Sequence, residues 1–347
     1  MNNVSHILIT GGTGFIGSRL ALQCARDGGV VRVVGQTNTP AEHDNRRELE
    51  QQGVQIIEAS VTDAEALRRA AAGIDVVYHL AAAQHEANVP DRHFYHVNAD
   101  GTKNMLEAAV EAGVKRFVHG STIGVFGISR NGPIHDDSPL DPDNIYGITK
   151  LEGERIARRY FDKLPVAIVR IAEAYGPGDR RLLKLFKGIR KGTFFMIGSG
   201  GNLHHVVYID DLIAGLRLAA TVDAAAGGTF VLAGPRAVTT DEMVAGIAGA
   251  LGVRPPRLRV PLWPMMTAAV VMERTLGPLG IQPPLHRRRM NFFVKSFSFS
   301  CREARATIGY APAVDFEEGA RYTAEWYVQR GMMETSNRQC RPRYAGP

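Results

Sequence analysis

Two ionisable side chains with a spacing that suits acid–base chemistry occur in the segment Tyr146-Gly147-Ile148-Thr149-Lys150. Residues four apart lie on one face of a helix, so the Tyr146 phenol and the Lys150 ammonium are expected to be neighbours. Tyrosine ordinarily titrates near pH 10, so a tyrosine that accepts protons at neutral pH needs a pKa lowered by roughly 3, about 4 kcal/mol. A nearby ammonium favours the phenolate. The pair is a candidate general base with its activator, although surface pairs with this spacing are common.

A cluster of small hydroxyl residues precedes this pair. Ser121 and Thr122 lie in the segment Gly120-Ser121-Thr122-Ile123-Gly124-Val125-Phe126-Gly127, directly after an apolar run that ends at His119. A hydroxyl at the end of a strand is suited to hydrogen-bond a reacting oxygen, so the order of cluster and Tyr-x-x-x-Lys strengthens the catalytic interpretation.

A glycine-rich loop, Thr10-Gly11-Gly12-Thr13-Gly14-Phe15-Ile16-Gly17, follows the apolar run Ile7 to Thr10 and opens a helical pattern. Gly11 permits a tight turn, Gly14 lets backbone amides approach a pyrophosphate, and Gly17 lets the helix pack closely on the strand. The helix N-terminus attracts the anion. We therefore predict a bound dinucleotide whose contacts include Gly11, Thr13, Gly14, Phe15, Ile16 and Gly17.

The end of the second predicted strand is where such sites distinguish NAD from NADP. An acid there binds the adenosine ribose, and an arginine accepts a 2′-phosphate. This chain has Val34-Gly35-Gln36-Thr37, with neither. Gln36 is expected to contact the cofactor, and the sequence leaves NAD or NADP open.

Short β-branched runs alternate with helical patterns through the first two-thirds of the chain. Strands are predicted over residues 7–10, 30–34, 54–57, 74–79, 117–119 and 166–170, and over 206–209 and 229–232 as strands that return to the sheet. Thr62 and Glu65 have capping-box spacing at the start of a helix that runs toward Ala71. Single helices between strands imply an α/β fold with a doubly wound parallel sheet.

Two domains are expected. The dinucleotide-binding Rossmann domain spans 1–177 plus about 206–235. A smaller C-terminal substrate domain spans about 178–205 plus 236–333, with 334–347 as a flexible tail, and the active site lies above the carboxyl ends of the strands.

The composition fits a globular enzyme. Of 347 residues, 45% are hydrophobic and 22% charged, and the net charge of +6 weakly favours an anionic partner such as a dinucleotide. The basic residues are spread along the chain apart from His286-Arg287-Arg288-Arg289, so no nucleic-acid partner is expected. Three cysteines without metal-ligand spacing indicate a reducing compartment and no metal site.

Membrane segments are not predicted. The start of the sequence lacks the features of a secretion signal. The apolar run Val260 to Met272 is too short to span a bilayer and is expected to be a buried or interfacial helix. We expect a cytoplasmic protein.

The chain resembles the extended short-chain dehydrogenases/reductases. This is the superfamily of nucleotide-sugar epimerases and dehydratases and of 3β-hydroxysteroid dehydrogenases. The matching motifs extend along nearly the whole sequence. Besides the glycine loop and Tyr-x-x-x-Lys they include Asp75 to Ala82, Val97 to Thr102, Arg170 with Ala174 to Asp179, Tyr208 to Asp211, and Ile308 to Pro312.

The resemblance implies roles for individual residues. Thr122 would hold the substrate oxygen, Tyr146 would be the general base or acid, and Lys150 would lower the pKa of Tyr146 and bind the nicotinamide ribose. Asn98 would either cap a strand end or support catalysis. The remaining implied cofactor contacts are Ser60, Val61, Leu80, Ala81, Ala82 and Asn98. Helices near 98–112 and 146–160 would form a homodimer interface.

Departures from the family pattern bear on the substrate, a small molecule. Dehydratases carry Asp-Glu after the catalytic threonine, where this chain has Ile123-Gly124, so dehydration is not expected. Glu173 and His204-His205 replace residues typical of nucleotide-sugar enzymes. Candidate substrate contacts are Ser121, Glu173, His205 and Arg287.

Three functions remain open at this stage. The first is hydride transfer at a secondary alcohol or ketone carbon of a sugar, nucleotide-linked, as an epimerase or dehydrogenase. The second is a 3β-hydroxysteroid dehydrogenase-like reaction on a hydrophobic cyclic alcohol, which the apolar segment 261–272 would favour. The third is a non-catalytic dinucleotide sensor, which the presence of both Tyr146 and Lys150 disfavours.

Overall fold

The computed structural model describes residues 5–84, 89–127, 132–276 and 287–334, with the backbone alone for 287–289. The chain divides into two units, each with its own internal packing. The first comprises Met1–Ala174, His204–Ala237 and Ser296–Val314, and the second comprises Tyr175–Leu203, Val238–Lys295 and Asp315–Pro347. The expected tail 334–347 lies outside the described residues except for Glu334.

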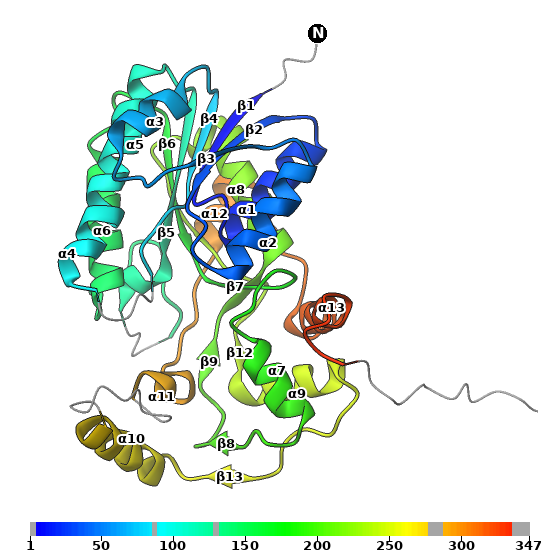
Figure 1. The fold of residues 1–347 in the computed structure, drawn as a ribbon. Coiled ribbons are helices and arrows are strands. Elements are labelled where there is room, and N and C mark those ends of the chain that lie inside the picture. Colours follow the sequence, from blue (N-terminus) through cyan, green and yellow to red (C-terminus); the bar gives the residue numbers. More distant parts are fainter. Residues whose placement is uncertain (1–4, 85–88, 128–131, 277–286, 335–347) are drawn as a thin grey trace, which may run out of the picture. The chain divides into compact units, whose positions relative to one another are not determined.

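A seven-stranded sheet forms the centre of the first unit (Figure 1). Its strands run in the order β3-β2-β1-β4-β5-β6-β11, and every neighbouring pair is parallel. Their bounds are β1 His6–Thr10, β2 Val30–Gly35, β3 Gln55–Glu58, β4 Val76–His79, β5 Arg116–Thr122, β6 Val166–Ile171 and β11 Thr229–Leu232. The strand order reverses between β1 and β4, and dinucleotides bind beyond the carboxyl ends of strands at such a point.

Helices cover both faces of this sheet, which confirms the predicted doubly wound α/β fold (Figure 1). One layer contains α3, α5 and α6, and the other contains α1, α8 and α12. The helix bounds in this unit are α1 Phe15–Arg26, α2 Pro40–Gln51, α3 Ala64–Ala71, α4 Asp91–Tyr95, the π-helical turn η1 His96–Asp100, α5 Gly101–Glu111, the 3₁₀ turn η2 Ile123–Phe126, α6 Ile145–Arg158, α8 Ile209–Thr221, the 3₁₀ turn η3 Asp223–Ala225 and α12 Arg302–Ile308.

The core explains why the central strands read as continuous apolar runs. Val77, Phe117 and Val166 are fully buried in one cluster with Leu67 of α3 and Leu106 of α5. A parallel strand covered on both faces has no solvent side, so β-branched residues occupy successive positions instead of alternating with polar ones.

Two local predictions are wrong. Val206–Tyr208 (β10) does not return to the main sheet but pairs with the short strand β7, Glu173–Tyr175, so only β11 rejoins the sheet. The N-cap of α3 is Asp63, whose carboxylate accepts the Ala66 amide at 3.0 Å, so Thr62 and Glu65 do not form a capping box. The Thr62 hydroxyl instead donates to Ser60 Oγ at 2.8 Å.

The second unit is smaller and mostly helical (Figure 1). Its elements are α7 Leu183–Arg190, β8 Met196–Ile197, β9 Leu203–His204, β12 Val238–Thr239, α9 Thr240–Ala250, β13 Arg259–Val260, α10 Leu262–Leu276, α11 Arg287–Val294 and α13 Phe316–Gln329. Helices α9 and α13 pack together, and the Tyr327 hydroxyl of α13 donates to the Asp179 carbonyl at 2.6 Å.

Residues Ser296–Val314, which we expected in the substrate domain, group with the first unit. The Tyr310 hydroxyl donates to the Ala233 carbonyl at 2.9 Å, and the Asp211 carboxylate accepts the amides of Ala313 and Val314. These bonds tie the segment to the end of β11 and the start of α8. No helix in the described parts of the chain is both long and apolar enough to cross a bilayer.

Candidate functional site

The glycine loop between β1 and α1 has little room for side chains. Gly11 has a φ of +68°, and a Cβ there would lie 2.8 Å from the Ala81 amide nitrogen, so the loop packs directly on the backbone beyond β4. A Cβ on Gly17 would lie 2.3 Å from the Gly11 carbonyl oxygen. Gly17 therefore packs the helix against the loop itself, not against the strand as expected, and Gly12 is the glycine that packs on β2, at Val33.

Gly14 differs from the other loop glycines. A Cβ there would meet one protein atom within 4 Å, the Gly11 carbonyl oxygen at 3.2 Å. Gly14 is also the N-cap of α1, so the helix has no side-chain cap, and its first turn contains no acidic residue. The space beside Gly14 and the uncapped positive end of the helix therefore fit a pyrophosphate.

Thr13 joins the loop to the end of β2. Its hydroxyl donates to the Gln36 carbonyl at 2.8 Å, and its own carbonyl accepts the Asn45 side-chain amide at 2.8 Å. Gly35 is necessarily small, because a Cβ there would lie 2.6 Å from the Thr13 hydroxyl. Thr13 thus holds the loop in place, while the Gln36 side chain is exposed at the strand end.

The other predicted cofactor residues lie beyond the carboxyl ends of β3 and β4. Ser60 Oγ accepts both the amide and the hydroxyl of Thr62. Val61 is buried against Gly101 at the start of α5, and Leu80 lies against Gly120 of β5. The Ala81 amide donates to the Thr10 hydroxyl at 3.3 Å. Ala82, which follows, is exposed.

Helix α6 carries Tyr146 in its first turn and Lys150 one turn later. The Asn144 side chain caps the helix by accepting the Gly147 amide at 3.0 Å. A Cβ on Gly147 would lie 2.6 Å from the Gly124 carbonyl oxygen, so the first turn of α6 packs tightly on η2. This contact brings the half-buried Tyr146 to the turn that follows Thr122.

Lys150 is almost completely buried, at 1% exposure. Burial lowers the pKa of its ammonium to about 8, and the Glu154 carboxylate, one turn further along α6, opposes that effect. Lys150 makes no hydrogen bond or ion pair within the described residues. Its ammonium is therefore a buried cation that retains its donors for a ligand.

Ser121 and Thr122 have different partners although they are adjacent. The Ser121 hydroxyl is buried and donates to Glu154 at 2.6 Å. The Thr122 oxygen accepts the Gly124 amide at 3.1 Å, and within the described residues its hydroxyl proton has no acceptor. Thr122 is also partly exposed, so it can donate to a ligand oxygen, whereas Ser121 is engaged in the core.

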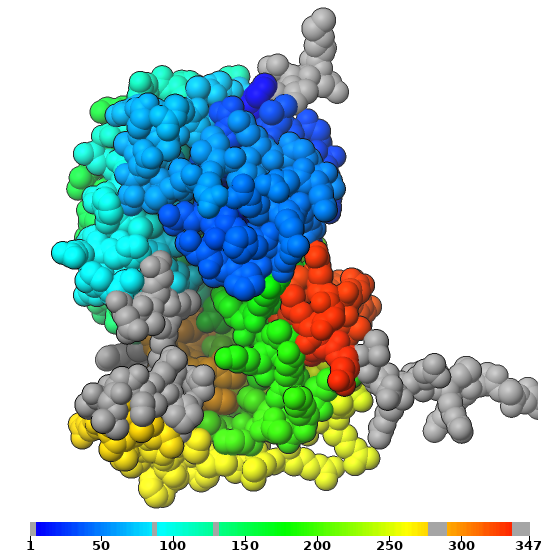
Figure 2. Space-filling model, viewed as in Figure 1, coloured from blue at the N-terminus to red at the C-terminus, as the bar shows by residue number. Residues whose placement is uncertain are grey.

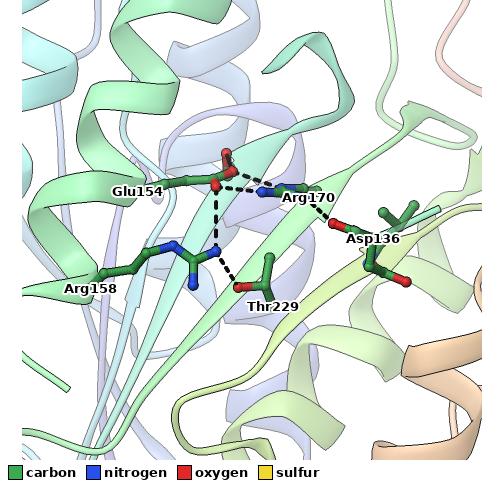
Figure 3. A network of polar contacts seen from close by, with 7 residues as sticks. Asp136, Glu154, Arg158, Arg170 and Thr229 are labelled. Atoms are coloured by element: carbon green, nitrogen blue, oxygen red, sulfur yellow. Dashed lines mark hydrogen bonds and ion pairs between the residues drawn. The ribbon is translucent and has the colours of Figure 1, made fainter. Parts of the chain in front are cut away.

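Glu154 belongs to a buried polar network (Figure 3). Its two carboxylate oxygens accept Arg170 Nε at 3.0 Å and Arg170 Nη2 at 2.9 Å. Arg170 also donates to the Asp136 carbonyl at 2.9 Å, and Arg158 lies 3.9 Å from the same carboxylate while donating to Thr229. Glu154 and Arg170 are 1% and 2% exposed. A buried charge without a counter-charge would destabilise the fold, and each of these two side chains supplies the counter-charge of the other.

Two stacked histidines lie close enough to Lys150 for its charge to affect their pKa values. The rings of His79 and His119 are 5.7 Å apart. His79 shares hydrogen bonds with the hydroxyls of Thr10 and Thr102, whereas neither ring nitrogen of His119 has a hydrogen-bond partner among the described residues. Burial, followed by repulsion from Lys150, lowers the pKa of His79 to about 3 and that of His119 well below its ordinary value. Both rings are therefore neutral at physiological pH.

Asn98 does not lie at a strand end, because it is in the π-helical turn η1. Its side-chain oxygen Oδ1 accepts the Ala83 amide at 2.8 Å, and its side-chain nitrogen Nδ2 donates to the Ala83 carbonyl at 3.1 Å and to the Thr149 hydroxyl at 2.9 Å. Asn98 thereby links the segment after β4 to the residue next to Lys150. Its side chain is fully buried, which favours a positioning role.

The predicted substrate residues have different surroundings. His205 is buried between backbone groups, with Nε2 donating to the Gly234 carbonyl at 3.0 Å and Nδ1 accepting the Phe299 amide at 2.9 Å. Glu173 is exposed, and its carboxylate lies 3.9 Å from His204. Arg287 begins α11, and its side chain, like all of His286, lies outside the described residues.

Four buried residues of the site were missed from the sequence: Glu154, His79, His119 and Thr149. Glu154 had a usable signal, because Arg170 lies in the apolar run Val166–Ile171 and a buried guanidinium requires an acidic partner. The described residues contain no group of three or more His, Cys, Asp or Glu side chains placed to hold a metal ion.

Two curated relatives are named for different substrates. The 3β-hydroxysteroid-dehydrogenase/decarboxylase isoform 2 of Arabidopsis thaliana is 32% identical over 78% of this chain, which spans 52% of that protein. The N-acetyl-α-D-glucosaminyl-diphospho-ditrans,octacis-undecaprenol 4-epimerase of Escherichia coli O157:H7 is 28% identical over 74% of this chain and 75% of its own length.

A solved structure shares the whole fold. DesIV, a dTDP-glucose 4,6-dehydratase from Streptomyces venezuelae crystallised with NAD, is 27% identical and superposes with a TM-score of 0.74 over 95% of this chain and 99% of its own. The model of the NAD dependent epimerase/dehydratase family matches residues 7–233, the span from β1 to the end of β11. This chain therefore belongs to the NAD-dependent epimerase/dehydratase family.

Proposed function

We propose that this chain interconverts a secondary alcohol and a ketone at a ring carbon of a sugar, through NAD-dependent hydride transfer, and that it works as an epimerase. The observation that carries the proposal is the arrangement on α6 and β5. Tyr146 packs beside the turn after Thr122, and Lys150 lies one turn away as a buried cation. Family membership supplies the reaction class, and the side chains supply the proton chemistry.

Each of the three catalytic residues has a distinct part. Thr122 donates its hydroxyl proton to the substrate oxygen and so fixes that oxygen beside Tyr146. Tyr146 removes the hydroxyl proton in the oxidative half-reaction and returns it in the reductive half. Lys150 places a positive charge one turn away, which favours the phenolate, and its free donors suit ribose hydroxyls. A bound nicotinamide would supply the hydride acceptor and donor, and inversion would require the hydride to return to the opposite face of the substrate carbon.

The surroundings of Gln36 favour NAD over NADP. A 2′-phosphate needs an unpaired basic residue at the end of β2. The nearby arginines of α2 are already paired, Arg46 with Glu50 and Glu58 and Arg47 with Asp44. No free positive charge in this described region is therefore available for an additional phosphate.

Dehydration remains outside the proposal. That reaction needs an acid and a base after the catalytic threonine, where this chain has Ile123 and Gly124. Ile123 is buried and apolar, whereas Gly124 has room for a side chain but carries none. Neither residue can move a proton.

A hydrophobic cyclic alcohol is the second candidate substrate. The Arabidopsis relative supports it, and so does the apolar helix α10, which contains no charged residue before Glu273. A non-catalytic sensor is the weakest alternative, because Tyr146, Lys150 and a donor hydroxyl at Thr122 are all present.

We further propose a homodimer built on the α4–α6 layer. Tyr95 of α4, Val110 of α5 and Ile148 of α6 are large apolar residues with exposures of 42%, 38% and 39%. Three such residues on adjoining helices of one layer are suited to pack against a second copy. Sedimentation of wild type and an Ile148→Lys variant would test this, since the variant should be monomeric.

The fate of the transferred hydrogen tests the proposed reaction. UDP- and dTDP-hexoses deuterated at C4 would be incubated with the protein, without added cofactor, and the products examined by mass spectrometry and NMR. An epimerase returns the deuterium to the inverted carbon. Transfer of the deuterium to free NAD in a parallel reaction with NAD added, or turnover only of a deuterated 3-hydroxysteroid, would contradict the proposal. Tyr146→Phe is the inactive control.

A further inference from the structure

Helix α10 has two apolar faces, and within the described residues only one of them is packed against a hydrophobic cluster. Leu262, Met265, Met266 and Ala269 lie against a small cluster that includes Ile197 and Met290. The other face contains Trp263, Thr267, Val271 and Thr275, which follow one another at intervals of four residues. A helix at the surface of a globular protein normally has polar residues on the face that is turned to solvent.

The outward face is apolar to an unusual degree. Trp263 is 74% exposed and Val271 is 53% exposed. The face therefore presents a large aromatic side chain and a branched aliphatic side chain to solvent. The two threonines use their hydroxyl protons within the helix, because each hydroxyl donates to the carbonyl four residues earlier, Thr267 to Trp263 at 3.0 Å and Thr275 to Val271 at 2.9 Å. Their methyl groups add apolar surface, and their oxygens remain as acceptors.

Exposed basic side chains occur on α10 and in the segment that leads into it. Arg274 is exposed at the C-terminal end of the helix, three residues after Val271. Arg254 and Arg257 are exposed in the segment that leads into α10, together with Leu258 at 63% exposure. None of these three arginines forms an ion pair within the described residues. Figure 2 shows this part of the chain, coloured yellow to gold, at the molecular surface.

We infer that the outward face of α10 binds the surface of an anionic phospholipid membrane. An interfacial helix combines an apolar face, an aromatic residue such as tryptophan at the depth of the headgroups, and basic residues that contact lipid phosphates. Trp263 and Val271 provide the apolar contact, and Arg254, Arg257 and Arg274 provide the charge. A second protein copy would need a complementary acidic and apolar surface, whereas anionic lipid matches both properties at once.

The helix lies on the membrane and does not enter it. Its 15 residues are too few to span a bilayer, and its other face is already packed on the protein. The binding is therefore expected to be reversible and sensitive to salt, because exposed arginines are screened by ions. This inference is independent of the hydride chemistry.

Tryptophan fluorescence gives a direct test. The chain has two tryptophans, so a Trp326→Phe variant reports on Trp263 alone. Vesicles of phosphatidylcholine with about 25 mol% phosphatidylglycerol, an anionic lipid that attracts exposed arginines, should shift its emission to shorter wavelength. Vesicles with brominated acyl chains should quench it. Unshifted and unquenched emission would overturn the inference.

Cosedimentation with the same vesicles separates apolar from electrostatic contributions. Trp263→Ser with Val271→Ser should weaken binding at least tenfold, and each Arg254→Gln, Arg257→Gln or Arg274→Gln change by about fivefold at low salt. Val30→Ser is the matched control, because Val30 is 52% exposed in the other unit.

Equal binding by the control and the Trp263→Ser/Val271→Ser variant would contradict the inference. So would a change in sedimentation coefficient of that variant in the absence of lipid, since the face would then belong to a second copy. Dinucleotide content measured on the same samples distinguishes this result from a failure of the proposed reaction.

Discussion

The Glu154 carboxylate lies one helical turn beyond Lys150 on α6 and accepts hydrogen bonds from Nε and Nη2 of the Arg170 guanidinium. One acid therefore serves two buried cations. It opposes the loss of charge that burial imposes on Lys150, and it neutralises Arg170 in the strand beside it. The site and the core of the first unit thus share one carboxylate, which makes the position sensitive in two separable ways.

Glu154→Gln should affect both stability and the pH profile. Arg170 would keep a buried charge without its carboxylate counter-charge, which costs about 3–5 kcal/mol of unfolding free energy. The pKa of Lys150, already lowered to about 8 by burial, would fall further because the opposing carboxylate is gone. The ammonium form is present below its pKa, so activity should decline at a lower alkaline pH than in wild type. Urea unfolding and a pH–rate profile would measure the two effects.

An Arg170→Met, Glu154→Gln double variant separates these effects. Removal of both charges should recover much of the stability, while the alkaline limb of activity remains shifted. An unshifted alkaline limb in both variants would mean that Glu154 does not act on Lys150.

Thr122→Val should mainly reduce the catalytic rate, whereas Ser121→Ala should mainly reduce stability. The Thr122 hydroxyl is expected to hold the substrate oxygen, so its loss should reduce kcat/KM by roughly 100-fold or more with a modest change in stability. The Ser121 hydroxyl is bonded to buried Glu154, so its loss should cost about 2 kcal/mol of stability and leave the rate nearly unchanged. A large rate loss in Ser121→Ala alone would reverse our assignment.

Gly14→Val and Gly17→Val test two different uses of glycine. A side chain at Gly14 meets little protein, so the Gly14→Val protein should fold with a loss below about 1 kcal/mol but bind NAD at least 100-fold more weakly, a loss of about 2.7 kcal/mol or more. A side chain at Gly17 collides with the Gly11 carbonyl and should destabilise the loop by ~1–3 kcal/mol. Thermal unfolding with and without NAD distinguishes them, and tight NAD binding by Gly14→Val would exclude the loop as the pyrophosphate site.

The two buried histidines should make the protein sensitive to acid. Both are neutral in the folded state with lowered pKa values, whereas in the unfolded chain they protonate near pH 6.5. Their contribution is complete above pH 6.5 and is lost as pH falls, toward pH 3 for His79. Each should cost about 2 kcal/mol by pH 5.

Substitution of each histidine by leucine checks this expectation. His119→Leu removes a ring that has no hydrogen-bond partner in the described part of the chain, so it should be nearly neutral at pH 7 and flatten the decline of urea stability with acid. His79→Leu leaves the hydroxyls of Thr10 and Thr102 without a bond and should cost about 1–3 kcal/mol at pH 7. An unchanged pH slope in His119→Leu would contradict the account.

The sheet was predictable from the sequence because buried parallel strands have a local signal. The apolar runs at 7–10, 30–34 and 166–170 correspond to β1, β2 and β6. Val206–Tyr208 has the same signal but pairs with β7, since strand content does not specify which strand is the partner. The cap of α3 was misplaced by one residue, because Thr62 and Asp63 are both good caps and only the three-dimensional path of the chain decides between them.

The site was predictable where motifs have fixed spacing and unpredictable where partners are distant. Tyr146 and Lys150 follow from helix geometry. The Ser121–Glu154 hydrogen bond joins residues 33 positions apart, and the backbone hydrogen bonds of His205 join residues 29 or more positions apart. No local sequence pattern indicates such contacts. Thr122 and Ser121 are chemically similar, so only the structure shows which hydroxyl is engaged in the core.

The measurement that tests the central claim most directly is to denature freshly purified protein and identify any released dinucleotide by mass spectrometry, alongside Gly14→Val. An epimerase regenerates its cofactor within one catalytic cycle, so we predict about one NAD per wild-type chain and none from the variant. A wild-type protein that releases no dinucleotide and then prefers NADPH in a binding titration would contradict the proposed epimerase.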